Sequence, residues 1–301
     1  MSDDQSLRAS PSRKRVVKRL GSARQRAVET RERLEAARPR SRLLDSLFGA
    51  AEHDVVTGGG VLAGAVGFRL FMLLVPYSFV VVATLGFLAG RSDESPSEVA
   101  ANFGAAGLAA TAVKGLADKS FWTGALALAG GVVALFLAAR ATVKTLRIVH
   151  RLVWGLGPPK AGGSTRAALG LIVVVTVALA LARVITGVGG YLVHILFLPL
   201  LVGIPTGLWL VVSMRGLPHA EGATWRDLLP GALVVGIGVE ALHLFTVVWI
   251  VRLIENKSEN YGVLGTALAL LFWAYVLGRV LTLSAVVNAS RWYAAHPQRA
   301  E

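Results

Sequence analysis

The hydrophobic positions of this chain gather into long blocks that hold almost no charge, and short polar stretches separate the blocks. An apolar run of about 18 or more residues is typical of a helix that crosses a membrane. The pattern therefore predicts an all-α, polytopic membrane protein. Six transmembrane helices are expected, at about residues 62–90, 121–141, 167–188, 191–214, 228–251 and 261–288.

Local sequence features refine these boundaries. The apolar stretch at 167–214 is long enough for two spans, and the glycine-rich GVGG at 187–190 predicts a tight turn between them. Pro76 predicts a kink in the first span. The second span is expected to end where charges return after Arg140. A loop is expected at 252–260, between the last two spans.

Basic residues are distributed unevenly between alternate sides of the six spans. The tails and loops of one side hold 23 Lys and Arg, and those of the other side hold 5. Because basic residues collect in cytoplasmic loops, this bias predicts that both termini lie in the cytoplasm. Orientation then explains most of the formal net charge of +13, and no nucleic-acid partner is expected.

Residues 1–57 form a basic cytoplasmic arm with 13 Lys or Arg and 8 Asp or Glu, which is expected to be partly helical or disordered. The alternative is a basic helix that lies on anionic lipid headgroups and ends near Pro39. Nucleic-acid binding is disfavoured, because the helix-forming stretch 12–38 has no aromatic side chain for stacking. Residues 58–290 are the expected transmembrane domain, and 291–301 the cytoplasmic tail.

The composition narrows the chemistry. Only 16% of residues are charged, against about 25% in soluble domains. The absence of cysteine excludes disulfides, thiolate metal sites and cysteine nucleophiles. No Walker loop, nucleophile elbow or zinc-ligand spacing occurs, so no metal or cofactor is expected. His53-Asp54 is a dipeptide of the kind that metal phosphohydrolases use. Nothing nearby adds further metal ligands, so a catalytic role for it is the least favoured interpretation.

Four charged residues lie inside the apolar blocks, namely Arg69, Arg183, Glu240 and Arg279, and His243 joins them. A charge at the centre of a membrane helix costs about 2.5–3.5 kcal/mol, so such side chains usually face the bundle interior and find a partner. The simplest hypothesis is an ion pair of Glu240 with Arg69 or Arg279 that locks helices together. The alternative is a polar pathway through the bundle.

Three arginines and one glutamate leave an excess charge of +2 in these blocks. Arginine matches phosphates and carboxylates bidentately, which favours an anionic ligand or lipid phosphates at the interface. Arg183 lies near the expected external turn and is placed to snorkel outward. His243 lies three residues after Glu240, on the same helix face. The pair suggests a proton relay, although a histidine in such a place is more often a packed, hydrogen-bonded residue.

The first, fifth and last expected spans each contain a short motif. The first span carries an apolar and aromatic run that ends in proline, the fifth begins near Leu-Pro-Gly, and the last combines Tyr-Gly with a Trp and Tyr two residues apart and a later Asn. The residues are Pro76; Leu229, Pro230 and Gly231; and Tyr261, Gly262, Trp273, Tyr275 and Asn288.

In the order and spacing of these motifs, the chain resembles the YihY/BrkB family over roughly residues 45–292. The family consists of six-span bacterial inner-membrane proteins, formerly mislabelled ribonuclease BN. Where the family commonly has Gly-Ala-Glu, this chain has Ser284, Ala285 and Val286, so no mechanism that uses that carboxylate carries over. Where the family usually has two adjacent aromatics, Phe68 is followed by Arg69.

The residues and the resemblance together predict a bacterial inner-membrane protein, transporter-like or part of the envelope, that handles an anionic or lipid-like solute. The alternative is a membrane scaffold or lipid-organising protein in which the charges only hold helices together. A membrane-embedded hydrolase or ribonuclease is the least favoured. The expected partners are membrane lipids and an anionic small-molecule or lipid ligand, and the oligomeric state stays open.

Overall fold

The structure is a computed structural model that describes residues 42–89, 121–157, 165–187, 191–246 and 251–299, with the backbone alone near some helix ends and in 181–187, 191–198 and 251–267. Contacts divide the chain into two units, Met1–Glu52 and His53–Glu301, and the second contains the apolar helices. Regular structure in the described residues is helical. The elements are α2 (Arg42–Val56), α3 (Gly59–Ala89), α6 (Phe121–Val153), α7 (Thr165–Gly187), α8 (Tyr191–Gly216), α9 (Trp225–Phe245), α10 (Val251–Ala295) and a 3-10 turn (Pro297–Arg299).

Five helices in the described residues are long and apolar enough to cross a membrane. Helix α7 adds a shorter apolar stretch, Thr165–Ala180. The all-α prediction is therefore confirmed for the described residues, whereas six spans and cytoplasmic termini stay predictions. The five candidate spans are Gly59–Gly86, Trp122–Val153, Pro199–Gly216, Trp225–Phe245 and Leu268–Ala295.

Two of the expected boundaries are wrong. Helix α6 does not end near Arg140 but continues to Val153, because apolar side chains recur every three or four residues there and are buried. The loop expected at 252–260 is helical, since α10 already begins at Val251. Five of its nine residues are Arg, Leu, Lys or Glu, and these favour helix even where their charge suggests a loop.

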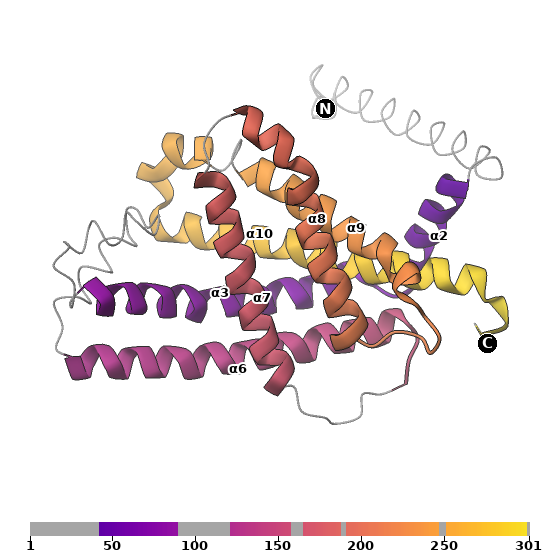
Figure 1. The fold of residues 1–301 in the computed structure, drawn as a ribbon, viewed down its shortest axis with the longest axis horizontal. Helices are drawn as coiled ribbons and strands as arrows, with labels where there is room; N and C mark the ends of the chain where they lie inside the picture. The colour runs from indigo at the N-terminus through magenta and orange to yellow at the C-terminus, as the bar shows by residue number, and fades with distance from the viewer. Residues whose placement is uncertain (1–41, 90–120, 158–164, 188–190, 247–250, 300–301) are drawn as a thin grey trace, which may run out of the picture. The chain divides into compact units, whose positions relative to one another are not determined.

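Helices α3, α6 and α10 pack against one another, and α3 and α6 run side by side in Figure 1. At the crossing of α3 and α10, a Cβ atom added to Gly278 would lie 2.6 Å from both the Ala63 carbonyl oxygen and the Gly67 nitrogen. Small residues at such a crossing let two helix backbones approach closely. The contact between α3 and α10 is therefore one of backbone against backbone.

Helices α8, α9 and α10 form a second set of close contacts. A Cβ atom added to Gly236 of α9 would lie 2.6 Å from the Val202 carbonyl oxygen of α8. The Trp209 Nε1–H of α8 donates a hydrogen bond of 2.8 Å to Ser284 Oγ of α10. Helix α7 packs mainly on α6 and only sparsely on α8. This arrangement leaves space between α7 and the α8–α9 pair.

Candidate functional site

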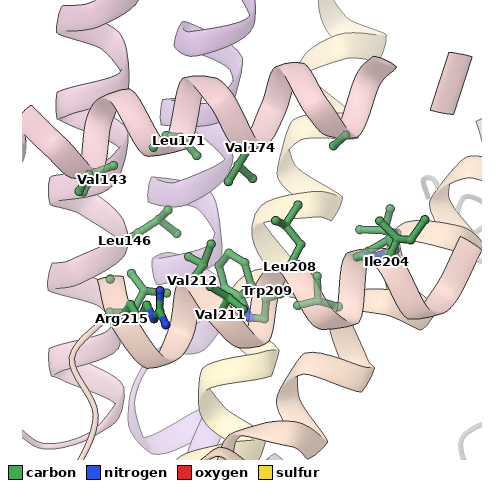
Figure 2. A pocket seen from close by; sticks show the side chains of 18 of the residues that line it. Val143, Leu146, Leu171, Val174, Ile204, Leu208, Trp209, Val211, Val212 and Arg215 are labelled. Atoms are coloured by element: carbon green, nitrogen blue, oxygen red, sulfur yellow. The ribbon is translucent and has the colours of Figure 1, made fainter. Parts of the chain in front are cut away.

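A cavity of about 640 Å³ lies between α6, α7, α8 and α9. Its volume is within the range of about 300–1,000 Å³ that is typical of small-molecule sites. Most of the lining is apolar. Figure 2 shows Leu171 and Val174 of α7 on one side and Leu208 and Val212 of α8 on the other. The walls therefore suit an apolar chain better than a polar solute.

Three arginines line the cavity where α7 begins and α8 ends. Arg166 lies in the first turn of α7, Arg215 in the last turn of α8, and Arg147 on α6. Figure 1 shows α7 and α8 running in opposite directions, so Arg166 and Arg215 lie at corresponding ends of the two helices. The Nε–H of half-buried Arg147 donates a 3.0 Å hydrogen bond to the Gly216 carbonyl, which ties α6 to the end of α8.

Glu240 and His243 of α9 line the opposite end of the cavity. One turn before Glu240, Gly236 packs against Val202 of α8, which lies 13 residues before Arg215. A helix rises about 1.5 Å per residue, so roughly 20 Å of α8 separates the two ends. The cavity thus has a cationic end, a long apolar middle and an end that carries a carboxylate.

The Glu240 side chain is only 8% exposed. Among the described residues its carboxylate has neither a hydrogen-bond nor an ion-pair partner, and its oxygens are not sealed within packed protein. Glu240 therefore opens into the cavity. His243 is half-buried beside it, one turn further along the same helix.

The expected ion pair of Glu240 with Arg279 is wrong. Both terminal nitrogens of Arg279 donate to the Asp54 carboxylate, and each hydrogen bond is 2.7 Å long. Helix α10 packs on α9 through Val280, which meets Gly238, whereas Arg279 points toward Gly59 at the start of α3. The two neighbouring residues thus face different helices, and Arg279 is directed away from α9.

Of the other two intramembrane arginines, Arg69 and Arg183, the structure describes the side chain of Arg69 only. Arg69 is exposed on α3, and no ion pair joins it to Glu240 within the described residues. The pairing of Glu240 with Arg69 is therefore not formed either. Arg183 belongs to α7, but only its backbone is described.

His53 and Asp54 make structural contacts at the end of α2. The His53 Nε2–H donates a 2.8 Å hydrogen bond to the carbonyl of Val153 at the end of α6, and Asp54 holds Arg279 of α10. The dipeptide thus links the chain before α3 to two helices that are distant in sequence. In the part of the chain that the structure describes, no group of three metal-ligating side chains comes together.

Two of the motif positions meet in space. The Gly231 N–H donates a 2.7 Å hydrogen bond to Asn288 Oδ1, and Asn288 Nδ2 donates to the Leu228 carbonyl at 3.2 Å. Pro230 lacks an N–H and its ring disturbs the preceding helical turn, so the backbone around it benefits from an outside partner. The amide of Asn288 is that partner, and the contact fixes α9 on α10.

The remaining motif positions have simpler surroundings. Pro76 lies inside α3, as expected. Trp273 is half-buried, and the backbone of Tyr275 lies against Gly67 of α3. Tyr261 and Gly262 lie in the part of α10 of which only the backbone is described.

Sequence reasoning missed the cationic end of the cavity. Arg147, Arg166 and Arg215 were counted as loop charges that report orientation, because each lies beyond an expected span. A usable signal existed for Arg147, since the buried positions Val143 and Leu146 continue a helical pattern past Arg140. For Arg166 and Arg215 the signal depends on how α7 and α8 are paired, which hydropathy does not reveal.

A protein-family model described as Virulence factor BrkB matches residues 57–301. The match includes α3 to α10 and therefore every residue that lines the cavity. Searches of curated proteins and of solved structures found no significant match.

Proposed function

Since this chain belongs to the Virulence factor BrkB family and is a multi-pass membrane protein, we propose that it is a transporter-like protein of the bacterial inner membrane that handles an anionic, lipid-like solute. The solute binds in the cavity between α6, α7, α8 and α9. Both termini lie in the cytoplasm. One observation carries the proposal, namely a mostly apolar cavity of about 640 Å³ with three arginines at one end.

The charge of the lining supports an anion. Among the described lining residues, three arginines and one glutamate give a formal charge of +2. Guanidinium groups bind phosphate and carboxylate through paired hydrogen bonds, and these are stronger than hydrogen bonds between neutral groups. Arg147 is held in place by the Gly216 carbonyl, so it is oriented before a ligand arrives. An anionic head therefore belongs at the arginine end.

The shape of the lining supports an apolar tail. The walls between the two ends consist mainly of Leu, Ile and Val side chains from α6, α7 and α8. Burial of apolar surface stabilises a bound chain by about 0.8 kcal/mol per CH₂ group. A solute that carries such a chain reaches the protein from the bilayer, and α7, which packs only sparsely on α8, forms one wall of the cavity.

The scaffold hypothesis remains the second candidate, and a specific observation favours it for one residue. Arg279 is engaged by Asp54, so this arginine stabilises the bundle rather than a solute. We propose no catalytic role for His53 and Asp54, because both side chains hold helix ends together. The scaffold hypothesis predicts that the arginines of the cavity bind no ligand, whereas the leading proposal predicts that they bind an anion.

A binding experiment tests the proposal. The probe is hexadecyl phosphate, added to purified protein in lipid nanodiscs, and the affinity is measured by calorimetry. The triple substitution of Arg147, Arg166 and Arg215 by Gln removes three charge-assisted donors, each worth about 1.5–3 kcal/mol, so the affinity is expected to fall by about 100-fold or more. Proteoliposomes that contain the wild-type protein are expected to transport a labelled anionic amphiphile, and the triple variant is expected to lose this activity.

The matched control changes the same formal charge outside the cavity. Arg140, Lys144 and Arg226 are exposed and do not line the cavity, so their triple substitution by Gln is expected to change the affinity by about threefold or less. Equal losses in the two triple variants would show non-specific attraction of an anion to a basic protein. Absence of both binding and transport in the wild-type protein would favour the scaffold.

A further inference from the structure

Glu240 differs from the other charged residues of the described cavity lining because it is buried, and its carboxylate has no partner among the described residues. The residue is more than nine-tenths buried, it lines the cavity, and its oxygens are not sealed within packed protein. Neighbouring lining positions on the same helix are Val235 and Val239. A carboxylate in such apolar surroundings disfavours any second negative charge and favours a cation or a hydrogen-bond donor.

No described residue of the neighbouring helices offsets this charge. The described lining of α8 at this end consists of Leu201, Ile204 and Pro205, and that of α7 ends with Ala178. Helix α10 meets α9 here through Val280, while Arg279 is occupied by Asp54. His243 is the other titratable residue among the described lining side chains of this end.

The cavity arginines are too distant to offset Glu240 directly. Arg215 lies roughly 20 Å away along α8, and Arg147 and Arg166 lie at the same end of the cavity, so none of the three is within ion-pair distance of Glu240. The two ends of the cavity therefore act on a ligand separately. The arginine end attracts the negatively charged head of a ligand, and the Glu240 end contacts the group at the far end of the ligand.

We propose that Glu240 is a specificity-determining residue that fixes the direction in which an amphiphile lies in the cavity, excluding a second anionic end and favouring a cationic one. This inference rests on the proposed function, because it requires an anionic head at Arg147, Arg166 and Arg215. The substrate class is thereby narrowed to amphiphiles with an anion at one end only. Discrimination comes from a repulsive element placed against the wrong ligand as well as from attraction to the right one.

The length of the cavity sets the probe. An extended chain advances about 1.2 Å per bond, so a chain of about 16 carbons spans the roughly 20 Å between the two ends. Three ligands share that length and the same carboxylate head, namely hexadecanoate, hexadecanedioate and 16-aminohexadecanoate. They differ only in the group that reaches Glu240, which is a methyl, a carboxylate or an ammonium group.

The experiment measures the affinities of the three ligands for wild-type protein in nanodiscs and for two matched variants. Glu240→Gln removes the charge with little change of shape. Glu221→Gln makes the same change on the exposed loop between α8 and α9, outside the cavity. Like charges about 4 Å apart repel by several kcal/mol at the effective dielectric constant of a protein site, so wild-type protein is expected to bind hexadecanedioate at least about tenfold more weakly than hexadecanoate. The 16-amino acid is expected to bind most tightly.

In Glu240→Gln the three affinities are expected to converge to within about threefold, whereas Glu221→Gln keeps the wild-type order. If wild-type protein binds the dioate as tightly as hexadecanoate, the inference is wrong, and this result does not depend on whether the variant folds. Failure of all three ligands to bind wild-type protein would instead reject the proposed function itself. Persistence of the discrimination in Glu240→Gln would assign it to another residue and overturn the inference.

Discussion

The contact between Asp54 and Arg279 allows a direct test of which carboxylate serves this arginine. Two double-mutant cycles share the variant Arg279→Gln, one with Asp54→Asn and the other with Glu240→Gln. The structure predicts an interaction free energy in the first cycle and none in the second. The ion-pair hypothesis drawn from hydropathy predicts the reverse, so the two cycles separate the alternatives.

The geometry gives the size of the expected effect. Both hydrogen bonds are 2.7 Å long, and the side chains of Arg279 and Asp54 are 36% and 14% exposed. A hydrogen bond to a charged group contributes about 1.5–3 kcal/mol when shielded from water, and an exposed ion pair contributes about 0.2–1 kcal/mol. For this partly exposed, bidentate pair we expect an interaction free energy of about 2 kcal/mol, after allowance for solvent screening. Sites without shared partners are additive within about 0.5 kcal/mol, which is the limit for the second cycle.

The assay is equilibrium unfolding of purified protein in mixed detergent micelles, followed by tryptophan fluorescence, for wild type and the variants of each cycle. The free energy of unfolding of each double variant is compared with the sum of its single variants. An interaction free energy below about 0.5 kcal/mol for Asp54 and Arg279 would refute the assignment. A value above about 1 kcal/mol for Glu240 and Arg279 would restore the direct ion pair.

Two further outcomes are expected. Asn288→Ala leaves the Gly231 N–H and the Leu228 carbonyl without their partner. The free energy of unfolding in the same assay should therefore fall by about 2–3 kcal/mol. An unchanged value would show that the backbone around Pro230 is satisfied without α10. The chain has no cysteine, so single cysteines report topology. An impermeant maleimide should label Ser95→Cys in intact spheroplasts but Gln298→Cys only after lysis, and the opposite result would reverse the proposed orientation.

Hydropathy was sufficient to find most of the helices, because a helix that crosses a membrane needs about 20 mostly apolar residues in a row. The first expected span, 62–90, corresponds to Gly59–Ala89, and the third, 167–188, corresponds to Thr165–Gly187. Hydropathy failed where a helix continues beyond its apolar part, as at the end of α6 and the start of α10. Charged residues there ended the predicted span but did not end the helix.

The candidate site was predicted only in part, because hydropathy contains no information about the rotation of a helix around its axis. Glu240 and His243 were recognised as unusual from their apolar neighbours, and both line the cavity. The partner of Arg279 was missed, since Asp54 lies 225 residues earlier in a segment assigned to the polar arm. The resemblance to a family identified Pro230 and Asn288 as important positions without indicating that Asn288 bonds the backbone on either side of Pro230.

Helix α10 follows α3, α6 and α9 in the chain, and it contacts all three. Until it enters the membrane, Asp54 lacks its arginine, and the backbone around Pro230 lacks the amide of Asn288. Before α10 is in place, the bundle therefore holds unsatisfied polar groups. A chain that stops short of α10 presents to quality-control proteases a bundle without the helix that closes it.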